Sequence, residues 1–271
     1  MIDHQAQLDS VTAVHKASGV VLDIFLKIDM GYGRAGVPPQ TEAAQTLITA
    51  TLDLSKSGAC HFLGLYCHAG QSYSGSSRVT ALNYLNTEFQ TLLTTSKLVQ
   101  PFLNYPLVLS VGATPTTTSI RNLLVEDSNL HSEETSAITA IKSTISSIRE
   151  TGCKLEMHAG VYPVLDVQQL STHALPSSGA QAVTFDDIAI TVVAEVASLY
   201  PGRGAGGTIE ALIGAGTLAL GREPCKAYSG WGILTPWNRP GASIPVTADE
   251  YTGWIVGRIS QERKRSPSYS A

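Results

Sequence analysis

The sequence predicts an α/β protein, in which a parallel sheet of about four βα units is followed by a region rich in β structure. Short apolar runs with many β-branched residues recur four times up to residue 158, and a helical pattern separates each run from the next. From about residue 181 the pattern changes to strand-like segments with many turns, Gly and Trp. Short runs that are buried on both faces and alternate with helices are typical of parallel sheets.

The expected strands are the four apolar runs, at residues 20–28, 61–67, 107–111 and 154–158. Apolar residues at helical spacing fill residues 41–58, 76–97 and 131–152 between them. Thr41 is a typical helix cap and Gly58 a typical stop, and the third segment has acidic residues in its first turn and stops at Gly152. Each strand is therefore expected to be followed by a helix that crosses to the next strand.

A change of composition near residues 171–182 predicts a boundary between two domains. We expect the first domain over residues 1–175 and a β-rich domain over residues 182–262. Strands are expected in the runs 188–200 and 251–260 of the second domain. Residues 263–271 are polar and of low complexity, which is typical of a disordered tail.

Composition and charge restrict the classes of function. Apolar residues make up 43% of the 271 residues, enough for a sizeable core. The net charge of −4, without a cluster of Lys and Arg, argues against nucleic acid as a partner. No run of about eighteen apolar residues predicts a membrane span, and the first ten residues lack the pattern of a signal peptide. We therefore expect a cytoplasmic protein that binds no membrane, with reduced thiols at Cys60, Cys67, Cys153 and Cys225.

Polar and glycine-containing segments follow each of the four expected strands. The carboxyl ends of parallel strands lie on one face, where α/β proteins bind ligands. Two of the segments, 112–114 and 160–162, join glycine to a hydroxyl residue, and free backbone N–H groups beside hydroxyls can bind a phosphate. The pattern therefore favours a ligand with a phosphate group. The residues expected to converge there are Lys27, Arg34, Tyr66, His68, Tyr73, Thr114, His158, Gly160 and Tyr162.

Several residues near these strand ends also have a purely structural interpretation. Asp29 can cap a helix or a turn instead of contacting a ligand. A lone histidine is usually a satisfied core residue, but Tyr66 and His68 share one strand face, and this pairing favours ligand contact. Residues 116–119 can simply cap the next helix. Cys67 and His68 are adjacent, which is poor geometry for holding one metal ion.

A glycine motif in the second domain points to a different ligand. Residues 202–207 match G-x-G-x-x-G between the run 191–200 and a helix-like segment at 208–220, as in a dinucleotide-binding turn. No second strand ending in an acidic residue follows at the required distance, although Glu223 lies near it. A nicotinamide enzyme is therefore the less favoured hypothesis.

Five segments carry a resemblance to a known family: "KIDMGYGRAGV", "GLYCHAGQSYS", "SVGATPT", "HAGVYP" and "EALIGAGTLALGREP", the last followed by "GWG" and "GWIVGRISQE". In this order they resemble the eukaryotic D-serine dehydratases, over residues 1 to about 262. These enzymes belong, with D-threonine aldolase, to the alanine racemase-like class of pyridoxal-phosphate enzymes. The resemblance implies a TIM-like (β/α)8 barrel, of which about four βα units are present, followed by a partial β-rich C-terminal domain.

The resemblance also implies roles for the converging residues. Arg34 would lie near the 3-hydroxyl oxygen of pyridoxal 5'-phosphate, with Lys27 behind it. Tyr66 would hydrogen-bond the pyridine nitrogen, and a neutral partner there suits elimination more than racemisation. Tyr73 would lie near the substrate or the phosphate. The cofactor-binding set implied is Arg34, Tyr66, His68, Tyr73, Thr114, Gly160 and Tyr162, of which the last three would hold the phosphate.

Two features of the resembled family have no counterpart in this sequence. The family's Schiff-base lysine lies on the first barrel strand, far upstream of the segment matched by "KIDMG", and only 26 residues precede Lys27. The family's zinc is held by a His and a Cys in a short motif near the C-terminus, and no His-x-Cys occurs here. We therefore expect a chain truncated at both ends, with no identified catalytic residue and no zinc ligands.

The resulting hypothesis is a D-serine dehydratase-like lyase, which uses pyridoxal phosphate to eliminate water and ammonia from D-serine and gives pyruvate. This chain alone is expected to be inactive. The implied partner is a small-molecule D-amino acid, and the complete family enzyme is expected to be a homodimer. Two alternatives stay open: a D-threonine aldolase-like lyase of the same family, and a non-catalytic protein that binds a phosphate ligand or another subunit.

Overall fold

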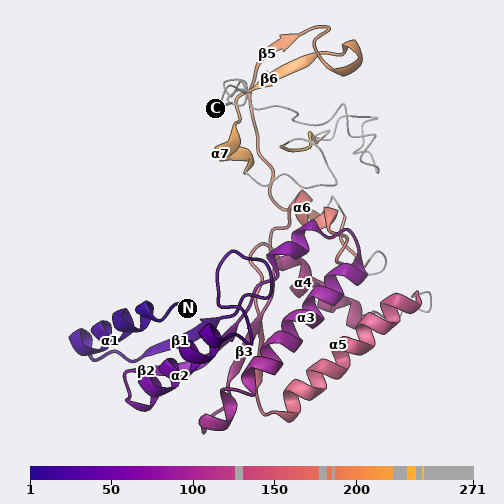
Figure 1. Cartoon of the computed structure of the whole chain (residues 1–271). Coiled ribbons are helices and arrows are strands. Elements are labelled where there is room, and N and C mark those ends of the chain that lie inside the picture. The colour runs from indigo at the N-terminus through magenta and orange to yellow at the C-terminus, as the bar shows by residue number, and fades with distance from the viewer. Residues whose placement is uncertain (126–130, 177–181, 185–186, 222–230, 236–239, 241–271) are drawn as a thin grey trace, which may run out of the picture. The chain divides into compact units, whose positions relative to one another are not determined.

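The structure is a computed structural model that describes residues 1–125, 131–176, 182–184, 187–221, 231–235 and 240 (Figure 1). It divides into two compact units. The first contains Met1–Pro163 and Thr172–Ala182, and the second contains Val164–Ser171 and Val183–Ala271.

The first unit is built on a parallel four-stranded sheet with the order β1-β2-β3-β4. Each strand pairs in parallel with the next strand in the sequence. The prediction of consecutive parallel βα units is therefore confirmed, with strands a few residues shorter than the apolar runs. The strands lie in linear order, so this sheet is open and does not close into a barrel. The strands are β1 (Leu22–Lys27), β2 (Cys60–Tyr66), β3 (Val108–Val111) and β4 (Lys154–Met157).

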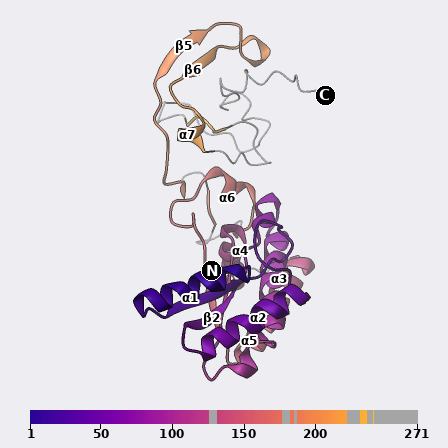
Figure 2. The same ribbon diagram turned by 60° about the vertical axis from the view of Figure 1, so that its left-hand side comes forward.

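Helices cover one face of this sheet (Figure 2). Ile24 and Leu26 are buried, whereas Phe25 and Lys27 beside them on β1 are partly exposed. Because side chains alternate along a strand, the buried set faces the helices and the other set faces away from them. The helices of the unit are α1 (Ala6–Ser18), α2 (Glu42–Lys56), α3 (Arg78–Ser96), α4 (Thr114–Ser119) and α5 (Ser132–Glu150), with 3-10 turns at Gly70–Ser74, Gln100–Phe102 and Ile120–Leu124.

Side chains fix where the two helices after β1 and β2 begin. The Thr41 hydroxyl accepts a hydrogen bond from the N–H of Ala44 at 3.2 Å, and the Ser77 hydroxyl accepts one from Thr80 at 3.2 Å. Each bond satisfies an N–H group that the first turn of a helix would otherwise leave without a partner. The capped ends bring both helices back along the sheet from the strand ends where the candidate site lies.

Two close contacts define the spacing of the strands. Ile2 forms a parallel bridge with Leu26, and its N–H donates to the carbonyl oxygen of Phe25 at 2.9 Å, so residue 2 extends the sheet beside β1. On β2, a Cβ at Gly64 would overlap the carbonyl oxygen of Val108. Glycine is therefore required there for β2 and β3 to pair.

The second unit contains an antiparallel pair, β5 (Val196–Tyr200) and β6 (Glu210–Ile213), and the short helices α6 (Val167–Ser171) and α7 (Thr217–Leu220). The strand expected over 188–200 is present only from Val196 onward, since residues 188–195 pair with no strand in the described part of the chain. The helix-like interpretation of 208–220 is wrong for its first part, which contains strand β6, and is confirmed only for its last four residues, which form α7. The expected strand 251–260 and the tail 263–271 lie outside the described residues.

The glycine motif of this unit lies in the connection between β5 and β6. The N–H of Gly204 donates to the carbonyl oxygen of Thr208 at 2.9 Å, and Gly206 and Gly207 have φ angles of 65° and 81°. These bonds and angles form a hairpin turn between two strands, whereas a dinucleotide-binding turn joins a strand to a helix. The dinucleotide-binding interpretation is therefore wrong.

Three of the cysteines, Cys60, Cys67 and Cys153, are buried free thiols, as expected, and Cys225 lies outside the described residues. Among the helices in the described part of the chain, none is long and apolar enough to cross a membrane.

Candidate functional site

A row of polar side chains crosses the sheet on the face that points away from the buried set. The strand register pairs Lys27 with Tyr66, Tyr66 with Ser110, and Ser110 with Glu156. These four residues therefore lie side by side near the carboxyl ends of β1 to β4. Sequence reasoning predicted the first two, but it missed Ser110 and Glu156 because their alignment depends on the register.

Aromatic rings stack just beyond this row. The rings of Tyr66 and His158 are parallel within 9°, with centroids 4.2 Å apart, and the rings of His68 and His158 are parallel within 11° at 6.3 Å. The Nζ atom of Lys27 lies 4.6 Å from the centre of the Tyr66 ring, within reach of a cation–π interaction. His68 is also held by its Nδ1, which lies 2.8 Å from the carbonyl oxygen of Gly112.

Burial holds the imidazole groups of this stack in the neutral form. It lowers the pKa of His158 to about 4, with a further contribution from His68. Burial likewise lowers the pKa of His68. The Nδ1 of His158 lies 3.1 Å from the Ser110 hydroxyl, and its Nε2 is buried with no hydrogen-bond partner among the described residues. The stack therefore offers a buried polar atom that remains available to a ligand.

The loop after β1 is organised by Asp29. Its carboxylate accepts hydrogen bonds from the N–H groups of Gly31, Tyr32 and Gly33 at 3.0 to 3.2 Å. Asp29 is thus a turn cap, one of the two roles that the sequence left open. The turn brings the ring of Tyr32 to 6.2 Å from the His68 ring and to 5.3 Å from the guanidinium carbon of Arg34. Arg34 itself is exposed.

The loops after β2, β3 and β4 meet through Thr114. Its N–H donates to the Tyr73 hydroxyl at 3.4 Å, and its own hydroxyl accepts from the N–H of Val161 at 3.4 Å. The predicted phosphate segments 112–114 and 160–162 therefore lie at the same end of the sheet. Gly160 has no atom within 4 Å of the position of a Cβ, and the Tyr162 side chain is 58% exposed.

Gly112 is needed for these loops to meet. Its φ angle is 141°, and a Cβ there would overlap the Thr117 hydroxyl and the carbonyl oxygen of His158. The same hydroxyl donates to that carbonyl at 2.7 Å, which fixes the loop after β4 against α4. A side chain at position 112 would separate these groups.

A buried acid supports the loop after β2. Glu88 on α3 is 0% exposed, and its carboxylate accepts the N–H of Ala69 at 2.8 Å. Burial raises the pKa of Glu88 to about 7. Sequence reasoning missed this residue, although an acid within the apolar stripe of Leu85, Phe89 and Leu92 was a usable signal.

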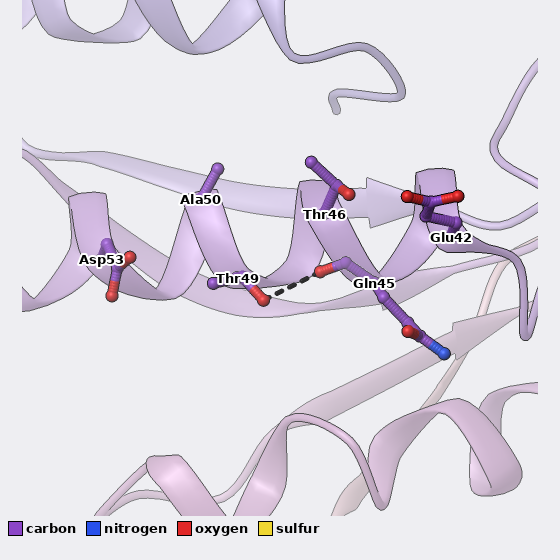
Figure 3. A pocket seen from close by; sticks show the side chains of 6 residues that line it. All are labelled: Glu42, Gln45, Thr46, Thr49, Ala50 and Asp53. Atoms are coloured by element: carbon purple, nitrogen blue, oxygen red, sulfur yellow. Dashed lines mark hydrogen bonds between the residues drawn. The ribbon is translucent and has the colours of Figure 1, made fainter.

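The described residues do not fit a zinc site, because they contain no group of three or more His, Cys, Asp or Glu side chains that could hold a metal ion. A groove on the surface of α2 does not form a site either. Figure 3 shows that Glu42, Gln45, Thr46, Thr49, Ala50 and Asp53 line it, all from one helix. The hydrogen bond drawn in that view joins the Thr49 hydroxyl to the carbonyl oxygen of Gln45 within the same helix. Among the described residues, no side chains from other elements converge on this groove.

Two family models match the chain. Residues 1–127 match "Alanine racemase, N-terminal domain", and residues 189–265 match "Putative serine dehydratase domain". The D-serine dehydratase of Schizosaccharomyces pombe is 35% identical over 97% of this chain and 54% of its own length. The D-serine dehydratase of Saccharomyces cerevisiae is 30% identical over 91% of this chain and 51% of its own length. The chain thus spans about half the length of the curated relatives it matches.

Solved structures with a similar fold include the D-threo-3-hydroxyaspartate dehydratase of Delftia sp. HT23. At 20% identity it has a TM-score of 0.58 and covers 89% of this chain and 54% of its own. An alanine racemase-like protein of Idiomarina loihiensis, also at 20% identity, has a TM-score of 0.58 over 91% of this chain and 55% of its own. The resemblance stated from the sequence is confirmed: over nearly its whole length this chain is similar to D-serine dehydratases, and its fold is alanine racemase-like.

Proposed function

We propose that this chain carries the cofactor-binding strand ends of a pyridoxal phosphate-dependent lyase that acts on D-serine. The observation that carries the proposal is the meeting of three loops at Thr114. At the same end of the sheet, the Nε2 of His158 is buried and has no hydrogen-bond partner among the described residues. The chain is also 35% identical to a D-serine dehydratase. The D-threonine aldolase-like and non-catalytic alternatives remain outcomes of the experiment below.

The chemistry of the donor set fits pyridoxal phosphate. The hydroxyls of Thr114 and Tyr162, next to the open space at Gly160, can donate to the phosphate. Arg34 is an exposed cation that suits the phenolic oxygen, and the Tyr66 hydroxyl suits the pyridine nitrogen. When bound, the cofactor supplies an electron sink for the bond that breaks at the α-carbon.

The chain's own residues bind and orient this ligand and hold protons near it. Burial, followed by the charge of Arg34, lowers the pKa of Lys27, so this amine loses its proton more readily than a free lysine. Burial raises the pKa of Tyr66, so its hydroxyl keeps a proton that it can donate to the pyridine nitrogen of the ligand. The residues that the structure describes do not fit zinc, and we assign no step to a metal.

For the complete enzyme of the family we propose a cytoplasmic homodimer, on the strength of the family resemblance. Light scattering of the complete enzyme, at a series of concentrations, tests the oligomeric state. A monomer at all concentrations contradicts the proposal.

The test of the function is to add pyridoxal phosphate to the purified chain and follow its absorbance. We expect a shifted absorbance band and release of the cofactor on dialysis after borohydride treatment, because the contacts proposed at these strand ends are non-covalent. Pyruvate from D-serine is expected to stay at the level of free cofactor. Turnover of D-threonine but not of D-serine favours the aldolase-like alternative, and no bound cofactor at all favours the non-catalytic one.

A covalent adduct would require a different role for Lys27. Turnover of D-serine well above free cofactor, abolished by Lys27→Ala, overturns the prediction of an inactive chain. The exposed Lys16 is the matched control, since Lys16→Ala removes a lysine of α1 outside the site.

A further inference from the structure

Three polar side chains form a relay that joins β3 and β4 to the ring stack. The Ser110 hydroxyl donates to the Oε1 of Glu156 at 2.6 Å, and the same hydroxyl lies 3.1 Å from the Nδ1 of His158. Ser110 is 1% exposed, whereas Glu156 is exposed. Neither Ser110 nor Glu156 has a role in the proposed binding of the cofactor.

The protons of this relay can be assigned from its contacts. A carboxylate only accepts hydrogen bonds, so the single hydroxyl proton of Ser110 goes to Glu156. The Ser110 oxygen then has only lone pairs for His158, so Nδ1 of the imidazole must be the donor. A neutral imidazole carries one proton, and its Nε2 is therefore an acceptor.

The Nε2 atom is the part of the relay that points to a ligand. It is buried and has no hydrogen-bond partner among the described residues. A buried acceptor without a partner costs about 1–3 kcal/mol. The stacking of the ring on Tyr66 at 4.2 Å holds its plane, so the ring is not free to turn toward another donor.

We propose that Ser110 and Glu156 are positioning residues that hold His158 in the Nδ1–H tautomer, so that its Nε2 accepts a hydrogen bond from an N–H group of the bound ligand. The N–H group is the amino group of the D-amino acid, since the ring nitrogen of the cofactor is the acceptor proposed for the Tyr66 hydroxyl. The ligand part rests on the proposed function, whereas the tautomer part depends only on this chain's own residues.

The test of the tautomer is 15N NMR of the full chain labelled in histidine, at pH 7, with the His158 signals assigned by their loss in His158→Gln. In the wild-type chain, Nδ1 of His158 is expected to be protonated and Nε2 unprotonated. Glu156→Ala removes the acceptor at an exposed position, so Ser110 can donate to Nδ1 and the Nε2–H tautomer gains population. Ser110→Ala is expected to act in the same direction.

The control for these variants is Glu150→Ala, which removes an exposed carboxylate of α5 outside the site and is expected to leave the His158 signals unchanged. A wild-type spectrum with Nε2 protonated overturns the proposal. If a folded Glu156→Ala chain keeps the wild-type tautomer of His158, the proposal is also overturned, because Ser110 and Glu156 would then only join β3 to β4.

The ligand part is tested by adding pyridoxal phosphate alone and D-serine alone to the labelled chain. A shift of the Nε2 signal is expected with D-serine, whereas a shift with pyridoxal phosphate alone contradicts the amino group as the donor. Glu156→Ala is expected to weaken that binding about tenfold, the loss of one hydrogen bond of about 1.4 kcal/mol. If the absorbance band reports bound cofactor while Nε2 stays unchanged in both arms, the ligand part is wrong. If no cofactor binds, the proposed function fails, and the tautomer result still decides the relay.

Discussion

The Nζ atom of Lys27 lies 4.6 Å from the centre of the Tyr66 ring, on the face of the sheet opposite to the helices. Burial lowers the pKa of this lysine and raises the pKa of the tyrosine beside it. Both shifts favour the neutral forms of the two groups. The pair therefore places, at the ends of two adjacent strands, a lysine that loses its proton more readily than a free lysine and a tyrosine that keeps its hydroxyl proton.

Replacing Lys27 tests this pair. In Lys27→Met the apolar stem is kept and the amine is lost, so we expect the affinity for pyridoxal phosphate to fall about tenfold, or about 1.4 kcal/mol. The free energy of unfolding at pH 7 is expected to stay level or rise, because the amine is partly buried. Cofactor absorbance and urea unfolding measure the two effects. Lys16→Met on α1 is the control, and equal loss of affinity in both variants contradicts the role of Lys27.

Tyr66→Phe keeps the aromatic ring and removes the hydroxyl, so it tests the two contributions separately. The stacking on His158 is retained, so we expect the free energy of unfolding to change by less than about 1 kcal/mol. The affinity for pyridoxal phosphate should fall about tenfold, because the pyridine nitrogen loses its hydrogen bond. Titration by absorbance measures the affinity. An unchanged affinity would remove Tyr66 from the site.

Two glycines are expected to respond in opposite ways. Gly160→Asp places its side chain in open space, so the chain should keep its stability but lose phosphate binding through charge repulsion and steric conflict. Gly112→Ala should instead destabilise the chain by about 1–3 kcal/mol, because its φ angle is 141° and two oxygen atoms occupy the space of the Cβ. Urea unfolding and cofactor titration measure both variants.

The control for the added charge is Ser146→Asp, on the exposed face of α5. If Gly160→Asp binds pyridoxal phosphate as tightly as Ser146→Asp does, the phosphate is not held at residues 160–162.

Glu88 should make stability depend on pH. Its pKa is about 7 in the folded chain, above the ordinary value of 4.5. Between these values the folded chain holds a proton that the unfolded chain has lost, so the free energy of unfolding falls as pH rises from about 4.5 to 7. The fall amounts to about 3 kcal/mol at 1.4 kcal/mol per pKa unit.

Urea unfolding at pH 5 and pH 7.5 measures this fall, and Glu88→Gln should reduce it because the amide does not titrate. The exposed Glu150→Gln is the control and should keep the wild-type difference. A Glu88→Gln chain with the full wild-type difference would assign the pH dependence to another group.

Much of the first unit could be predicted from the sequence, because its signals are local. The caps at Thr41 and Ser77 and the apolar runs determine where helices and strands begin. Tyr66 and His68 share a face because side chains alternate, which needs no knowledge of the neighbouring strands.

The parts that sequence reasoning missed depend on distant residues. Ser110 meets Glu156 only through the register of β3 and β4, and no local pattern gives that register. The error at 208–220 has the same cause, since β6 is a strand only because β5 pairs with it. Apolar residues there are compatible with either structure until the partner is known.

The Asp29 turn has a consequence for competing anions. A run of free backbone N–H groups after a strand normally attracts dissolved phosphate or sulfate, but here the carboxylate of the same chain already acts as the counter-ion of three of them. A buffer anion can therefore bind these three N–H groups only if it first displaces the Asp29 carboxylate. Inhibition of cofactor binding by inorganic phosphate should accordingly arise at the Thr114 end of the sheet and follow a single competitive isotherm.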